Sequence, residues 1–208
     1  MRNPTLSTLA LLMVSWFADP RPPISPAQKA TPQILSVAAA SDLKFALDEI
    51  VLAFQREHSD IRVRVSYGSS GNFYAQLAQR APFDLFFSAD VSYPTKLVDA
   101  GLAVANSKFS YAMGRIVVWA PTNSPIDPTK LGAAALQHPA LHRIAIANPD
   151  HAPYGKAAVA ALVKLGIYDA VKSKLVFGEN IAQTAQFVDT GADSGQDGQR
   201  WSCRSSLL

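Results

Sequence analysis

The chain has 208 residues, of which 49% are apolar and 17% are charged, a balance typical of a globular protein with one core or two small ones. This composition excludes a collagen, a coiled coil and a disordered chain. The formal net charge is +3, but residues 34–190 hold 14 basic and 13 acidic side chains. Without a basic run, nucleic acid is not predicted as a partner. The single cysteine, Cys203, excludes an internal disulfide and a cysteine-ligated structural zinc.

The first thirty residues have the order of a secretory signal peptide. Arg2 precedes an apolar stretch from Leu6 to Ala18, and a proline-rich segment follows at 19–26. The apolar stretch is shorter than the roughly 20 residues that a transmembrane helix needs. We therefore expect residues 1–30 to be signal peptide and linker, with a membrane anchor or a disordered start as the alternatives.

From Ile34 onward, short apolar runs alternate with stretches of helical period, which predicts an α/β fold with parallel sheets and crossover helices. The predicted strands are 34–39, 61–67, 83–88, 115–120, 143–148 and 175–178. The predicted helices are 43–54, 73–80, 93–100, 129–137, 156–165 and 181–189. In the first helix, the apolar residues from Leu43 to Phe54 form one stripe.

Four segments place a small polar or glycine-containing turn between a strand and the next helix. Ser41 follows the first strand, Ser70 follows the second, and the turns at 148–156 and 178–183 follow the fifth and sixth. We expect Ser41 and Ser70 to be helix N-caps, which is also the ordinary structural role of such residues. Because helix starts carry unpaired N–H groups and strand ends converge in α/β sheets, the four segments together predict a small-anion site.

Five motifs at these positions resemble the periplasmic molybdate-binding proteins of ABC importers. They are VAAASDL at 37–43, YGSSGNF at 67–73, FDLFFSAD at 83–90, IANPDHAPYG at 146–155 and GENIAQTAQFV at 178–188. The resemblance runs in order from about Ile34 to Gly191. It implies a two-lobed type II periplasmic binding protein, with lobe 1 at 34–112 and lobe 2 at 113–190, whose lobes close over the ligand about a hinge.

The resemblance also implies a ligand and its donors. Molybdate or tungstate would be held by the hydroxyls and amides of Ser41 and Ser70 and by the backbone amides of Tyr154 and Ile181. Such neutral donors suit an oxyanion that only accepts hydrogen bonds. The implied partners are the permease and the ATPase of an ABC importer, and the implied protein is a periplasmic monomer that is not an enzyme and has no cofactor.

Other polar residues in these motifs have ordinary structural interpretations. Asp42 is expected at the first helical position, facing solvent and complementing the helix dipole. His151 is expected to be a surface turn residue, and Asp84 and Asp90 to be turn formers or caps and not metal ligands. The segment from Gly68 to Gly71 is not the nucleophile elbow of a hydrolase.

Two other functions stay open at this point. One is a binding protein for another tetrahedral oxyanion, such as sulfate or thiosulfate. The other is the effector-sensing half of a transcription regulator, in which a helix-turn-helix would have to replace the secretory start.

The last eighteen residues, 191–208, form an aberrant tail in this pattern. They show neither strand nor helix period and are rich in Gly, Ser, Gln and Arg. Members of the family return here to the first lobe with a further strand and helices. That return segment is missing, which predicts a truncation or a frame shift near residues 192–193.

Overall fold

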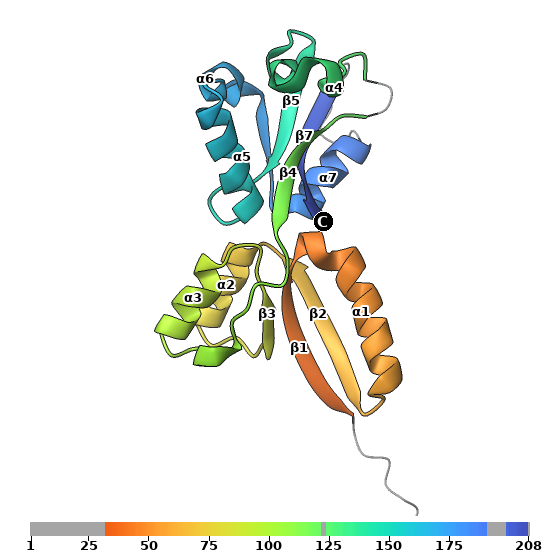
Figure 1. Ribbon diagram of the computed structural model, residues 1–208, viewed down its shortest axis with the longest axis vertical. Coiled ribbons are helices and arrows are strands. Elements are labelled where there is room, and N and C mark those ends of the chain that lie inside the picture. Colours follow the sequence, from red (N-terminus) through yellow and green to blue (C-terminus); the bar gives the residue numbers. More distant parts are fainter. Residues whose placement is uncertain (1–31, 122–123, 191–198, 208) are drawn as a thin grey trace, which may run out of the picture. The chain divides into compact units, whose positions relative to one another are not determined.

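A computed structural model of the chain describes residues 32–121 and 124–190, together with the backbone of 199–207 (Figure 1). The predicted signal peptide at 1–30 and residues 191–198 of the predicted tail lie outside the described residues. Within the described part of the chain, no helix is long and apolar enough to cross a membrane.

The first lobe is built on a three-stranded parallel sheet with the strand order β2-β1-β3. Figure 1 shows α1 beside β2 and the pair α2 and α3 beyond β3. The elements of this lobe are β1 (Gln33–Ala40), η1 (Ser41–Leu43), α1 (Lys44–Glu57), β2 (Ile61–Gly68), α2 (Ser70–Ala78), β3 (Leu85–Phe87), α3 (Ser92–Asp99) and η2 (Ala105–Ser107).

The second lobe is built on a four-stranded sheet with the order β4-β7-β5-β6. Helices α5 and α7 both pack against β5 and lie to either side of this sheet in Figure 1. The elements are β4 (Gly114–Trp119), α4 (Pro128–Leu131), η3 (Gly132–Gln137), β5 (Leu141–Ala147), α5 (Pro153–Lys164), α6 (Tyr168–Val171), η4 (Lys172–Lys174), β6 (Leu175–Gly178), α7 (Ile181–Thr190) and β7 (Gln199–Leu207).

All six predicted strands are present, but the sequence pattern did not predict β7. This strand pairs antiparallel with β4 and parallel with β5, so the second sheet is mixed and not purely parallel. Its backbone pairs with a strand on each side. This pairing stabilises the strand without requiring a hydrophobic pattern in its sequence. The available signal was weak, because Trp201, Cys203 and Leu207 recur at even spacing among polar residues.

Each lobe has its own apolar core. In the first, Val37 and Ala39 of β1 pack with Leu43, the last residue of η1, and with Leu47 in the first turn of α1. The predicted stripe of α1 is only partly buried, because Ile50 is 61% exposed. The core of the second lobe is larger and includes Leu141, Ile144, Ile146, Ala158, Leu162 and Val171.

Small residues bring helix starts close to strand ends in both lobes. Ala38 and Ala39 of β1 are fully buried just before the turn at Ser41. In the second lobe, a Cβ at Gly155 would collide with the backbone carbonyl of Ala147 at the end of β5. The absence of a side chain at Gly155 therefore lets the first turn of α5 pack directly on the strand.

Candidate functional site

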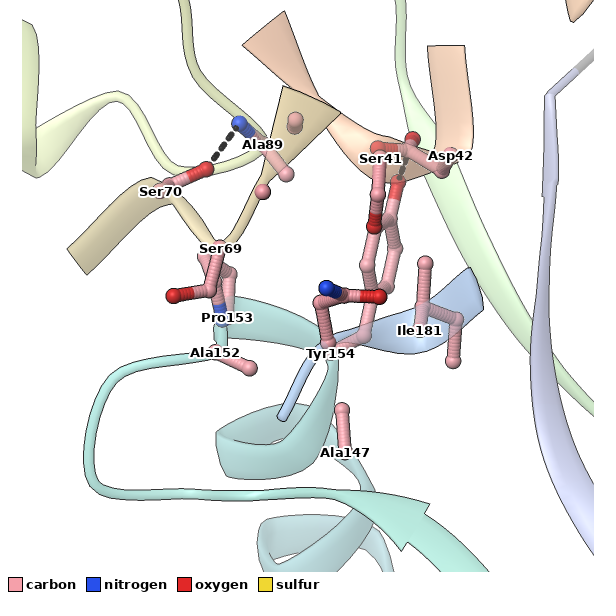
Figure 2. A pocket seen from close by; sticks show the side chains of 13 residues that line it. Ser41, Asp42, Ser69, Ser70, Ala89, Ala147, Ala152, Pro153, Tyr154 and Ile181 are labelled. Carbon is pink, nitrogen blue, oxygen red and sulfur yellow. Dashed lines mark hydrogen bonds between the residues drawn. The ribbon is translucent and has the colours of Figure 1, made fainter. Parts of the chain in front are cut away.

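A small cavity lies where the segments after β1, β2, β5 and β6 meet, and both lobes contribute to its wall (Figure 2). Its free space is about 210 Å³, including the part that opens to solvent. The lining residues are Ala40, Ser41, Asp42, Gly68, Ser69, Ser70, Ala89, Ala147, Ala152, Pro153, Tyr154, Asn180 and Ile181.

The structure brings the four predicted ligand residues together in this cavity, but with a different role for the serines. Ser41 is the first residue of η1 and Ser70 is the first residue of α2, whereas the N-cap positions belong to Ala40 and Ser69. The prediction that Ser41 and Ser70 are N-caps is therefore wrong by one position. The shift matters because N–H groups in a first helical turn have no partner within the helix.

Tyr154 and Ile181 also lie at helix starts. Tyr154 is the second residue of α5, after Pro153, and Ile181 is the first residue of α7. Proline suits the first position of α5, because the N–H that it lacks would have no partner within the helix. Four helical segments therefore begin at one cavity, two from each lobe.

The Ser70 side chain is fixed by a loop of its own lobe. Ser70 is 1% exposed, and its hydroxyl oxygen accepts a hydrogen bond from the backbone N–H of Ala89 at 3.0 Å (Figure 2). Because the oxygen accepts in this contact, the hydroxyl proton remains available for another acceptor. Ser41, at 8% exposed, is buried as well.

Side-chain and backbone hydrogen bonds hold the two loops of the second lobe. The Asn148 side chain accepts from the N–H of Asp150 at 3.0 Å, and the Asn148 N–H donates to the carbonyl of Gly178 at 2.7 Å. At the start of α7, the Asn180 side chain accepts from the N–H of Gln183 at 3.0 Å. These contacts order the two loops and give α7 the side-chain cap that the serines do not supply.

Asp42 does not face solvent as expected. Its Oδ2 accepts a hydrogen bond from the Tyr154 hydroxyl at 2.8 Å, and its buried Oδ1 has no hydrogen-bond partner. Burial raises the pKa of Asp42, while the hydrogen bonds from Tyr154 and from the backbone at Asp42 and Leu43 partly offset the rise. The solvent prediction failed because a residue of the other lobe covers this carboxylate.

The cavity wall contains neutral donors and one carboxylate. Among the described residues that line it, there is no lysine, arginine or histidine, and Asp42 is the acidic one. Lys156, in the first turns of α5, donates instead to the Tyr93 hydroxyl at 3.0 Å, and this contact raises the lysine pKa. An anion in this cavity would therefore meet helix starts and hydroxyls and not a cationic side chain.

His151 lies in a turn, as predicted, but its side chain is largely covered and contacts the other lobe. Its Nδ1 lies 3.0 Å from the Ser69 hydroxyl, and its Nε2 lies 3.5 Å from Oε2 of Glu179. Its side chain is 20% exposed. The Glu179 carboxylate also accepts from the Asn72 side chain at 2.6 Å. Local sequence could not reveal this cluster, because its members come from three separate segments.

Of the other two aspartates, Asp90 has the predicted local role, since it accepts from the backbone N–H of Ser92 at 2.8 Å at the start of α3. Asp84 instead accepts from the backbone N–H of Ser36 in β1 at 2.7 Å, a contact between segments that are far apart in the sequence. Over the residues that the structure describes, His, Cys, Asp and Glu form no group of three or more that could hold a metal ion.

Comparison with known proteins places these features among solute-binding proteins. Residues 35–195 match the family model described as bacterial extracellular solute-binding protein. The molybdate-binding protein ModA of Azotobacter vinelandii is 41% identical over 76% of this chain, and that of Rhodobacter capsulatus is 38% identical over 78%. The solved structure of the Azotobacter vinelandii periplasmic molybdate-binding protein aligns with a TM-score of 0.71 at 31% identity, covering 81% of this chain and 71% of that one.

The matches do not extend over the full length of the two ModA relatives. The aligned part of the chain spans 61% of the Azotobacter protein and 62% of the Rhodobacter protein.

Proposed function

Because the chain belongs to the family of bacterial extracellular solute-binding proteins, we propose that its cavity captures molybdate or tungstate for delivery to an ABC importer. The proposed ligand donors are the hydroxyls and amides of Ser41 and Ser70 and the amides of Tyr154 and Ile181. The names of the relatives support this choice of ligand, since two of them are molybdate-binding proteins.

One observation carries the proposal: four helical segments from two lobes begin at one cavity without a cationic side chain in its described wall. A dianion is costly to bury unless many donors and dipoles converge on it. Fully deprotonated molybdate accepts hydrogen bonds and donates none, so hydroxyls and backbone N–H groups suit it. Tungstate has the same charge and acceptor chemistry and should bind to the same donors.

Asp42 would oppose an anion if its charge faced the cavity. Its Oδ2 is instead turned toward the Tyr154 hydroxyl, as Figure 2 shows. The burial that raises its pKa also favours the protonated form, which carries no charge. Both features reduce the repulsion between Asp42 and a bound oxyanion.

The proposal includes export and partners. We expect residues 1–30 to direct export and to be removed, so that the binding protein works as a monomer in the periplasm beside a permease and an ATPase. In this role it is not an enzyme and needs no cofactor. Expression of the full chain in a Gram-negative host tests the export step: a shortened mature N-terminus in the periplasmic fraction supports it, and an intact N-terminus in the cytoplasm contradicts it.

Ligand-induced stabilisation tests the capture step. A ligand that binds only the folded state at about 100 times its Kd raises the free energy of unfolding by about 2.7 kcal/mol. Molybdate and tungstate should therefore raise the melting temperature of the purified chain, with sodium chloride of equal ionic strength as the control. No shift with either oxyanion would contradict the proposal.

A further inference from the structure

Ser69 occupies the N-cap position of α2 but does not cap its helix. Its backbone is extended, as in an N-cap, yet its side chain makes no capping hydrogen bond. Its hydroxyl instead lies 3.0 Å from Nδ1 of His151, which belongs to the second lobe. Serine is favoured at N-caps because its side-chain oxygen accepts a hydrogen bond from a backbone N–H of its own helix. The Ser69 side chain makes a contact between lobes instead of this local one.

The backbone of His151 makes a second contact with the same helix. The N–H of Gly71, in the first turn of α2, donates to the His151 carbonyl at 2.9 Å. A Cβ at Gly71 would collide with this carbonyl oxygen. The close approach of the two lobes at this point therefore depends on glycine at position 71 and not on its backbone angles.

Glu179 extends the contact to a third segment. Its carboxylate accepts from the Asn72 side chain at 2.6 Å and lies 3.5 Å from Nε2 of His151. An imidazole with its proton on Nε2 satisfies both neighbours, since Nδ1 then accepts from Ser69 and Nε2–H points to Glu179. Asn72 and Ser69 belong to the first lobe, and His151 and Glu179 belong to the second.

We propose that His151 is a positioning residue whose contacts with Ser69 and Gly71 hold the closed arrangement in which Ser70 and Tyr154 face the same cavity, while Glu179 of its own lobe orients the imidazole. The ligand in this inference rests on the proposed function, but the contact itself does not. If the ligand binds the closed arrangement, its apparent Kd is the intrinsic Kd divided by the closed fraction. Contacts between the lobes then raise affinity without touching the ligand.

Gly71→Ala is the sharpest variant, because it adds one methyl group where the lobes meet. Alanine is the better helix former, so α2 itself should lose no stability. We expect the population to move to an open arrangement and the affinity for molybdate to fall by about tenfold or more. Ser92→Ala, in the exposed first turn of α3, is the matched control and should leave both unchanged.

Three substitutions at position 151 separate the contacts. His151→Ala removes the imidazole and keeps the carbonyl that accepts from Gly71. His151→Asn keeps a polar group near the place of Nδ1 and should recover part of the lost affinity through Ser69. His151→Gln can reach Glu179, which lies in the same lobe, and should therefore recover less affinity than His151→Asn. A fold-only role would predict the same affinity for both amides at equal stability.

Distances between the lobes can be measured without any ligand. Dyes on Glu57→Cys in α1 and Lys164→Cys in α5, both at exposed positions in a Cys203→Ser background, report opening by energy transfer. We expect longer distances for Gly71→Ala and His151→Ala than for the parent chain, at unchanged melting temperature. Identical distance distributions in all three would overturn the inference.

Molybdate titrations of the same variants keep the two proposals distinguishable. A parent chain that shows no binding while Gly71→Ala still opens contradicts the proposed function and supports the contact. A parent chain that binds molybdate with the same Kd and dissociation rate as Gly71→Ala and His151→Ala contradicts the contact and supports the function.

Discussion

The Tyr154 hydroxyl, at the start of α5, donates to Oδ2 of Asp42 at 2.8 Å, beside the serine that opens η1. One hydrogen bond thus joins the turn that carries Ser41 to the helix start that carries the Tyr154 amide. Both residues line the cavity. The aromatic side chain therefore contributes to the site differently from its backbone: the amide is a proposed ligand donor, and the hydroxyl links the lobes.

Tyr154→Phe should separate these two roles. The variant keeps the amide but removes the hydroxyl that donates to Oδ2 of the buried Asp42 carboxylate. Leaving this buried acceptor without its donor costs about 1 to 3 kcal/mol. We expect a lower free energy of unfolding in urea at pH 7 and weaker, but not abolished, molybdate binding. Tyr168→Phe, in α6 and outside the cavity, is the control; equal effects of the two substitutions would contradict this role for Tyr154.

Asp42→Asn should change how stability depends on pH. Burial raises the pKa of Asp42 above its ordinary 3.8, so the folded chain binds this proton more tightly than the unfolded chain does. The resulting stability is fully present below pH 3.8 and is lost as the pH rises through the folded pKa. The free energy of unfolding of Asp42→Asn, relative to the parent, should therefore increase with pH across this window. A constant difference would contradict the assignment.

Asp48→Asn provides a comparison of opposite sign. Hydrogen bonds from Lys44 and Tyr67 lower the pKa of Asp48. Its contribution to stability is therefore present above pH 3.8 and lost as the pH falls through the lowered value. Urea unfolding over the same buffers should show that the stability difference between the parent and Asp48→Asn shrinks as the pH falls. The gain in stability of Asp42→Asn over the parent should also be smallest at low pH.

Ser70→Ala should weaken oxyanion binding directly. A hydrogen bond to a charged group contributes about 1.5 to 3 kcal/mol, or roughly ten- to a hundredfold in Kd. The Ala89 N–H also loses its acceptor, so the melting temperature should fall modestly. Ser107→Ala removes a surface hydroxyl that donates to Val104 and should change neither quantity. An unchanged Kd for Ser70→Ala would remove this serine from the ligand set.

The sequence predicted those residues of the site whose place follows from their position at the end of a strand. Ser41, Ser70, Tyr154 and Ile181 all follow strand ends, and strand ends of α/β sheets converge, so their meeting in one cavity was predictable. The contacts of Asp42 and His151 were missed because their partners are remote. Tyr154 is 112 residues from Asp42, and Ser69 is 82 residues from His151, distances over which local pattern carries no information.

The fold shows the same limit. Buried strands such as β1 and β5 were predictable as short apolar runs, but β7 was not, because its place is set by backbone pairing with β4 and β5. The stripe of α1 correctly predicted a helix, yet it could not show that Ile50 would be left exposed. Periodicity reports which face of a helix is apolar, and the neighbouring elements decide whether that face is covered.

Calorimetric titration of the purified chain with molybdate, tungstate and sulfate tests the central claim most directly. The proposed function predicts one site that binds molybdate and tungstate tightly. Tight binding of sulfate with no heat from molybdate would contradict it.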